Sequence, residues 1–184
     1  YGAISIQEWD RQLKQENKHL VKGHAAIKAY YQRQEIAKDY AKETYRIYPA
    51  NCFDIMERKS VSALIEHFFP HETDLKLLDM ACGDGRILQG LLQYGECTGI
   101  DSSATMLMQI QSRLQNDAVT LKQIDPLVEK PKGQYDVVTA FHFLRHFEYS
   151  TRKLLWEILR ELLSDRGILL IDVPNLLFEM PNRQ

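Results

Sequence analysis

Residues 77–88 read Leu-Leu-Asp-Met-Ala-Cys-Gly-Asp-Gly-Arg-Ile-Leu, and this stretch decides the fold of the chain. Its apolar first half is typical of a buried strand, and the glycine-bearing turn that follows opens into a helical pattern. In an α/β sheet, such a junction points backbone N–H groups into a crevice at the end of the strand. We therefore expect a ligand-binding site at this turn.

The two glycines of the turn narrow the class of ligand. A dinucleotide-binding turn follows the pattern Gly-x-Gly-x-x-Gly. Here Ala81 precedes Gly83 and Gly85, and Leu88 stands where the third glycine belongs. A phosphate-binding P-loop would continue with Gly-Lys-Ser or Gly-Lys-Thr, which does not follow this turn in the sequence. The pattern disfavours a nicotinamide-dependent oxidoreductase, which we keep as a third interpretation, and a P-loop protein.

The composition bounds the class of protein. The chain has 184 residues, 45% hydrophobic and 26% charged, as in an ordinary globular domain. Its formal net charge of −2 predicts no basic surface for nucleic acid or for an anionic membrane. The sequence has neither a membrane-spanning apolar run nor a leader, and its three cysteines include no Cys-x-x-Cys pair. We expect one cytoplasmic domain without disulfides that binds neither nucleic acid nor membrane.

The residue pattern changes along the chain from helical to alternating strand and helix. A capping-box spacing at Ser5 and the lack of proline up to residue 48 predict a helix over 5–48, broken at Gly23, and a second helix is expected at 58–69. Strands are then expected at 76–80, 97–100, 120–124, 135–141 and 167–173, with helices at 85–93, 104–115 and 150–163. We expect Arg166-Gly167 to end the last helix. This alternation predicts a parallel sheet.

Residues 77–88 resemble motif I of the class I S-adenosylmethionine-dependent methyltransferases: an apolar strand, an acidic residue, two small residues and Gly-x-Gly. Further landmarks of this family follow in order between Tyr40 and Asn175. The resemblance implies an α/β fold, a three-layer sandwich with a mainly parallel sheet of order 3-2-1-4-5. It divides the chain into an N-terminal helical cap, residues 1–70, and a Rossmann-like core, residues 71–184. The family's C-terminal hairpin is missing, because only eleven residues follow Val173, so we expect a fragment or a shortened sheet.

The resemblance also implies the cofactor, S-adenosylmethionine, with S-adenosylhomocysteine as product. It places this cofactor against Asp79, Ala81, Cys82, Gly83 and Gly85. Asp79 would organise the amino-acid end, and a side chain at either glycine would collide with the cofactor. Asp101, which ends the second strand, would accept hydrogen bonds from two ribose hydroxyls. The alternative for Asp101 is to cap the next helix.

The resemblance extends this site to the residues after the later strands. Ser102 would lie beside Asp101, and Met106 would contact the adenine, with core packing as the alternative for the methionine. Asp125 would recognise the adenine amino group, or it forms an ordinary turn before Pro126. Phe141 and His142 would line the cofactor pocket.

The segment after the fourth strand faces the transferable methyl group in this family. Leu144-Arg145-His146 matches the family's Leu-x-His, which makes His146 the candidate general base. The alternatives for His146 are a helix cap and a place in the core. His142 and His146 have the spacing of a metal-binding pair, but Phe143 stands where the zinc-protease pattern needs Glu. We therefore expect no metal.

The N-terminal region is rich in tyrosine, which in a helix usually indicates core packing. Asp39-Tyr40 with Tyr45 nevertheless resembles the family's helix that folds over the cofactor as a lid. Arg58, at the start of the next expected helix, would reach the cofactor carboxylate.

The resemblance implies an enzyme that transfers a methyl group to an O or N of a small-molecule acceptor. Motifs for nucleobase amino groups, cytosine C5 and protein arginine are absent after the fourth strand in the sequence. The alternative is a non-catalytic module that binds the cofactor or a protein partner. Such a partner, or a second copy in a homodimer, would dock on the N-terminal helices or on the open sheet edge.

Overall fold

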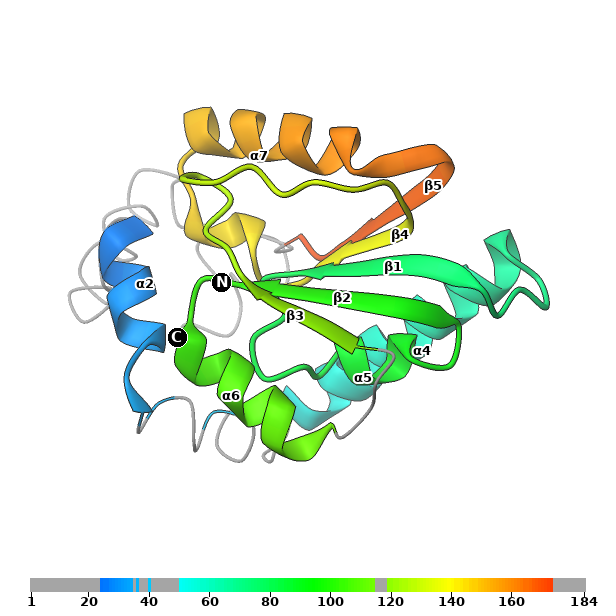
Figure 1. Cartoon of the computed structure of the whole chain (residues 1–184), viewed down its shortest axis with the longest axis horizontal. Helices are drawn as coiled ribbons and strands as arrows, with labels where there is room; N and C mark the ends of the chain where they lie inside the picture. Colours follow the sequence, from blue (N-terminus) through cyan, green and yellow to red (C-terminus); the bar gives the residue numbers. More distant parts are fainter. Residues whose placement is uncertain (1–23, 35, 37–39, 41–49, 115–118, 174–184) are drawn as a thin grey trace, which may run out of the picture.

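The computed structural model describes residues 24–34, 36, 40, 50–114 and 119–173 (Figure 1). The elements in this part of the chain are α2 (His24–Tyr31), α4 (Ala50–Phe68), β1 (Leu75–Met80), α5 (Leu88–Leu91), β2 (Gly95–Asp101), α6 (Ala104–Arg113), β3 (Val119–Gln123), β4 (Tyr135–Ala140), the short 3₁₀ helix η2 (Leu144–His146), α7 (Tyr149–Glu161) and β5 (Leu163–Ile171). Among these elements, no helix is long and apolar enough to cross a membrane.

The five strands form one parallel sheet with the order β3-β2-β1-β4-β5. The predicted α/β class and strand order are confirmed. Helices α4, α5 and α6 cover one face of the sheet and α7 covers the other, which gives the expected three layers (Figure 1). β1 lies at the centre, where both faces are covered, and this accounts for its nearly continuous apolar sequence.

Alternate residues of β1 enter two separate cores, one on each face of the sheet. Leu75 and Leu77 pack in the core that contains residues of α4, α5 and α6, whereas Leu78 and Met80 pack in the core that contains residues of α7. The period-2 geometry of a strand produces this division. Lys76 of β1 is exposed, whereas Asp79 is a polar residue buried in the middle of the sheet, which indicates a role other than packing.

The last strand differs from its prediction. β5 begins at Leu163 directly after α7, so Arg166 and Gly167 lie inside the strand, and their predicted role as a helix end is wrong. The pairing with β4 shifts between the pairs Tyr135–Leu163 and Val137–Ile168. A Cβ on Gly167 would lie 2.7 Å from the Tyr135 carbonyl oxygen. A strand irregularity, rather than a helix terminus, therefore requires this glycine.

The helices before the sheet also differ from their predictions. α2 ends at Tyr31 and is followed by non-helical residues at Gln32 and Arg33, so the long expected helix has a break there in addition to any at Gly23. α4 begins at Ala50, eight residues before the expected start at Arg58. The helix after the glycine turn is confined to Leu88–Leu91, because residues 84–87 remain in turns.

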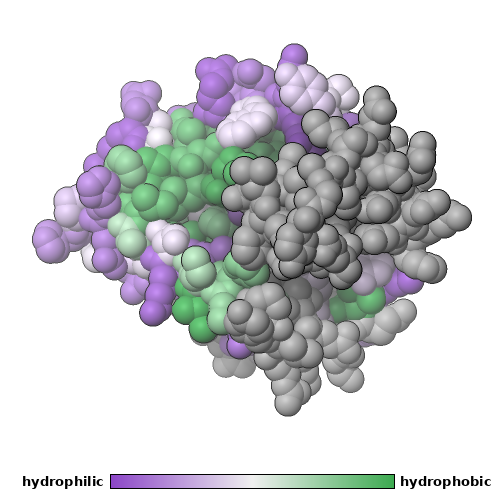
Figure 2. All heavy atoms as spheres, turned by 180° about the vertical axis from the view of Figure 1, so that it is seen from behind, coloured by the Kyte–Doolittle hydropathy of each residue, from purple (hydrophilic) through white to green (hydrophobic). Residues whose placement is uncertain are grey.

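The surface carries apolar as well as polar areas, as the view from behind shows (Figure 2). α4 exposes Met56 and Phe68, with exposed fractions of 62% and 55%, although its opposite side packs on the sheet. The edge strand β5 leaves Ile168 and Leu169 only partly buried. That a partner or a second copy covers such surfaces stays a prediction.

Candidate functional site

The carboxyl ends of β1, β2 and β4 surround a cavity of about 990 Å³, open solvent at its mouth included. This is the position at which open parallel sheets bind ligands. Ten of the residues predicted from the sequence line it together: Asp79, Ala81, Cys82, Gly83, Asp101, Ser102, Met106, Phe141, His142 and His146. Three others, Gly85, Arg58 and Asp125, are not among the lining residues, and Tyr45 lies outside the described residues.

The turn after β1 bends sharply by using left-handed backbone. Ala81 has φ +57° and Gly83 has φ +54°. A Cβ on Gly83 would have a single neighbour, the Ala81 carbonyl oxygen at 4.0 Å, so it would point into the open cavity. A side chain at Gly83 would therefore occupy part of the cavity.

Gly85 has a different reason to be glycine. Its φ is +80°, and a Cβ there would lie 3.0 Å from Ile110 Cγ1 on α6. The side chain would collide with Ile110 in the protein core, and Gly85 is not among the residues that line the cavity. That it would also collide with a cofactor stays a prediction. Gly85 allows α6 to pack closely against the turn.

Asp101 holds the turn in place from the end of β2. Its Oδ2 accepts a hydrogen bond from the Gly83 N–H at 2.9 Å, and its Oδ1 accepts one from the Ser103 N–H at 2.8 Å. Burial raises the pKa of this carboxyl group, and these backbone bonds oppose the shift. The N-cap of α6 is Ser103, so the alternative that assigned this cap to Asp101 is wrong. A carboxylate oxygen that accepts one bond can accept another from a ligand hydroxyl.

Asp79 is buried at the end of β1. Its Oδ1 accepts a hydrogen bond from Thr139 Oγ1 at 2.7 Å. Its Oδ2 is buried and has no hydrogen-bond partner among the described residues. Burial raises the pKa of Asp79 to about 7, although Thr139 opposes the shift. A buried acceptor of this kind favours a ligand that brings a donor, above all a cationic one.

Helix α2 forms a wall of the cavity that residues of the core do not supply. The Tyr31 carbonyl oxygen accepts hydrogen bonds from Ser103 Oγ at 2.7 Å and from Thr105 Oγ1 at 3.1 Å. Lys28 Nζ lies 3.0 Å from Asp125 Oδ2. This ion pair turns Asp125 towards α2, while its neighbours Ile124 and Pro126 line the cavity. Sequence reasoning missed Lys28 and Tyr31, because their contacts are more than 70 residues away.

The arginine at the cavity is Arg86 rather than the predicted Arg58. Arg58 pairs with Asp54 on the same helix, with 2.7 Å between Nη2 and Oδ2, and does not line the cavity. Arg86 lines it, and its Nη1 lies 3.0 Å from Asp54 Oδ1 and 2.6 Å from Glu57 Oε2. The sequence feature that indicates Arg86 is its position directly after Gly85, in the turn itself.

Two histidines that follow β4 in the chain, His142 and His146, line the cavity. His146 belongs to η2, and its ring is edge-on to Tyr31 with 6.2 Å between the centroids. Burial, together with the charge of Arg145, lowers the pKa of His146 to about 4, so its imidazole is neutral at pH 7. His142 has φ +54°, and its backbone N–H donates to Asp172 Oδ1.

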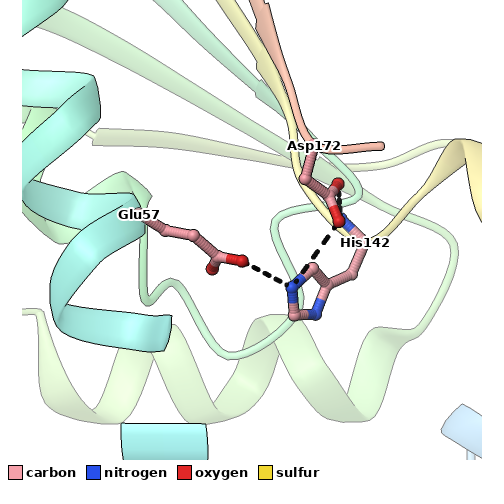
Figure 3. Close-up of side chains that lie close together, drawn as sticks. All are labelled: Glu57, His142 and Asp172. Atoms are coloured by element: carbon pink, nitrogen blue, oxygen red, sulfur yellow. Dashed lines mark hydrogen bonds and ion pairs between the residues drawn. The ribbon is translucent and has the colours of Figure 1, made fainter. Parts of the chain in front are cut away.

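The His142 ring meets two carboxylates that the sequence analysis did not consider. Its Nε2 lies 3.0 Å from Glu57 Oε1 and 3.7 Å from Asp172 Oδ2 (Figure 3). Burial acts to raise the pKa of Glu57, but the hydrogen bond with His142 and the charge of Arg86 outweigh it and hold this pKa below its usual value. The three side chains come from α4 and from the ends of β4 and β5.

The comparison with protein families agrees with this geometry. The model of a family described as a methyltransferase domain matches residues 78–169, half of the chain. The chain therefore belongs to this methyltransferase family, and the resemblance found at residues 77–88 is confirmed. The nicotinamide-dependent alternative loses its support, since Leu88 at the third glycine position is fully buried in the core.

Relatives and solved structures extend the comparison. An uncharacterized protein of Haemophilus influenzae is 30% identical over 148 residues, 72% of this chain and 55% of that protein. The mitochondrial ubiquinone biosynthesis O-methyltransferase of Candida albicans is 30% identical over 95 residues, 46% of this chain and 28% of that protein. This chain thus spans about half the length of the first relative and less of the second. The solved DhpI-SAM-HEP complex has 21% identity and a TM-score of 0.63, over 98% of this chain and 73% of that one, which shows a shared fold.

Proposed function

We propose that the chain binds S-adenosylmethionine in the cavity and transfers its methyl group to an O or N of a small-molecule acceptor. The observation that carries this proposal is the turn of a methyltransferase-family chain that opens, at Gly83, onto a cavity lined also by Asp79 and Asp101. S-adenosylhomocysteine is then the product.

The polar groups of the cavity match the parts of this cofactor. Asp101 would accept hydrogen bonds from the ribose hydroxyls while it keeps its bonds to the turn. Asp79 would receive the cofactor's ammonium group, which supplies the donor that Oδ2 lacks among the described residues. Arg86 would face the cofactor carboxylate, in the role predicted for Arg58. The apolar wall of Met106, Ile124 and Pro126 would hold the adenine.

The reaction demands little from the protein beyond alignment. The acceptor's lone pair attacks the methyl carbon, the C–S bond breaks, and its electron pair stays on sulfur. Holding the three atoms in line and excluding water supplies most of the rate enhancement. The acceptor becomes strongly acidic as the new bond forms, so the neutral imidazole of His146 suffices to take its proton even with a low pKa.

The first test is calorimetric titration of the chain with S-adenosylhomocysteine. We expect saturable binding that Asp101→Ala weakens at least about tenfold, because a charge-assisted hydrogen bond contributes about 1.5–3 kcal/mol. Glu157→Gln, on the exposed side of α7, serves as the control and leaves the affinity unchanged. Absence of binding by the folded wild-type chain would contradict the proposal.

A non-catalytic module is the second candidate, favoured by the exposed apolar side chains of α4. Such a module would bind the cofactor or a protein partner without turnover. A panel of hydroxyl and amine acceptors with radiolabelled S-adenosylmethionine separates the two candidates. Methyl transfer to any of them excludes the non-catalytic candidate.

A further inference from the structure

Three side chains with metal-binding atoms converge at the β4–β5 side of the cavity. Glu57 Oε1, His142 Nε2 and Asp172, through one carboxylate oxygen, lie within 4.8 Å of one another. Figure 3 shows both carboxylates directed at the same ring nitrogen of His142. All three side chains are partly buried, with side-chain exposures between 19% and 22%.

The His142 ring nitrogen faces two carboxylate oxygens. A single ring nitrogen carries at most one proton, so His142 Nε2 cannot donate a full hydrogen bond to both Glu57 and Asp172. The distances reflect this, because one carboxylate lies at 3.0 Å and the other at 3.7 Å. A cation in place of the proton would satisfy all three groups at once.

The carboxylates around the cluster outnumber the guanidinium groups by one. Among the described residues, the carboxylates of Asp54, Glu57 and Asp172 face two guanidinium groups, those of Arg58 and Arg86. Arg86 contacts Glu57 through Oε2, so Oε1 remains turned towards His142. Arg86 therefore orients the carboxylate rather than occupying its binding oxygen.

We propose that Glu57, His142 and Asp172 form a binding site for a divalent transition-metal cation at the edge of the methyl-transfer cavity. Metal–ligand bonds of about 2.0–2.2 Å place adjacent ligand atoms roughly 3–3.7 Å apart. The two distances from His142 Nε2, 3.0 Å and 3.7 Å, lie in this range, and the third pair of atoms lies within 4.8 Å. One imidazole and two carboxylates suit Mn²⁺, Fe²⁺ or Zn²⁺ better than Ca²⁺, which prefers oxygen alone.

The site gives the proposed methyl transfer a substrate preference, and in this it rests on the proposed function. His142 lines the cavity, so a cation on its Nε2 would lie next to the acceptor. A cation polarises a hydroxyl that it contacts and makes its proton easier to lose to the neutral imidazole of His146. The oxygen then takes the methyl carbon while sulfur keeps the electron pair of the broken bond. The acceptor class that fits is an oxygen acceptor able to bind a metal, such as a catechol or an α-hydroxy carbonyl.

Mn²⁺ titration followed by electron paramagnetic resonance tests the site in the full chain after treatment with a chelator. We expect one Mn²⁺ per chain, with hyperfine coupling to a nitrogen nucleus from His142. Asp172→Asn should weaken binding at least about tenfold, since a neutral amide is a poor metal ligand. His142→Ala should remove the nitrogen coupling. Glu157→Gln on α7 is the control and should bind Mn²⁺ as the wild type does.

Two results would overturn the site: no Mn²⁺ bound at about 1 mM, which is weaker than ordinary protein cation sites, or binding that Asp172→Asn leaves unchanged. Asp172→Asn keeps the oxygen that accepts the His142 N–H, so it tests the site even if His142→Ala does not fold. Calorimetry with S-adenosylhomocysteine on the same samples separates the two proposals. Cofactor binding without Mn²⁺ binding would refute the metal site and leave the proposed cofactor site standing. The two carboxylates would then suit an ammonium group of an amine acceptor.

Discussion

The two sides of the cavity are built from the chain in different ways. On the β1–β2 side, Asp79 lies at the end of β1, Gly83 and Arg86 lie in the turn that follows it, and Asp101 bonds to that turn across 18 residues. On the β4–β5 side, Glu57 meets His142 across 85 residues, and His142 meets Asp172 across 30. A local turn carries its function in its own sequence, whereas the other side exists only once the sheet has formed.

The largest expected effect separates the two glycines of the turn. Gly83→Leu should reduce the affinity for S-adenosylhomocysteine by more than about 100-fold, because its side chain enters the cavity, at a stability cost of about 1–2 kcal/mol. Gly85→Leu should instead destabilise the fold by at least about 3 kcal/mol through its clash with Ile110. Calorimetry and thermal unfolding measure the two effects. Equal losses of affinity at equal stability would remove the distinction between the glycines.

A substitution on the β4 side of the cavity should affect turnover rather than cofactor binding. His146→Gln removes the base but keeps a polar side chain, so we expect methyl transfer to fall about 10²-fold, within the usual range for general bases. The affinity for S-adenosylhomocysteine should change by less than about threefold, a loss below 1 kcal/mol. Initial rates with an acceptor that the wild type methylates provide the measurement, and His67→Gln on the exposed side of α4 is the control. Unchanged rates would exclude His146 as the base.

The remaining prediction concerns stability rather than ligand binding or turnover, and it is a pH dependence at Asp79. Its pKa in the folded state, about 7, lies above the ordinary 3.8, so the folded chain binds more protons than the unfolded chain between these values. The free energy of unfolding should therefore fall as pH rises from 4 to 7, by at most about 1.4 kcal/mol per pH unit from this group. Asp79→Asn should remove this slope while the contributions of Asp84 and Asp101, whose pKa values are also raised, remain.

Denaturant unfolding of wild type and Asp79→Asn at several pH values measures the slope without ligand. Parallel pH profiles for the two proteins would show that the pKa of Asp79 is not raised in the folded chain. With the cofactor bound, an ammonium group beside Asp79 would favour the ionised form, so the slope should also shrink in the presence of S-adenosylhomocysteine.

Local patterns predicted much of the fold and of the β1–β2 side. The alternation of apolar strands and helices predicted a parallel sheet, and the family resemblance implied its strand order and placed Asp79, Gly83 and Asp101 at one site. The errors arose where a local signal had two physical causes. A glycine can mark either the end of a helix or an irregularity in a strand, and Gly167 lies at a strand irregularity. The sequence favours Arg58, on the helix next to the site, over Arg86, because the sequence alone does not show that Arg58 forms an ion pair with Asp54.

The sequence by itself determined the class of fold, the position of the ligand turn and the family, because these depend on periodicity and on residues that are neighbours in the chain. Only the tertiary structure decided that Lys28 pairs with Asp125, that Ile110 packs against Gly85, and that Glu57 and Asp172 both approach Nε2 of His142. These contacts depend on how separate elements lie against one sheet, and the one-dimensional spacing of residues does not encode such distances.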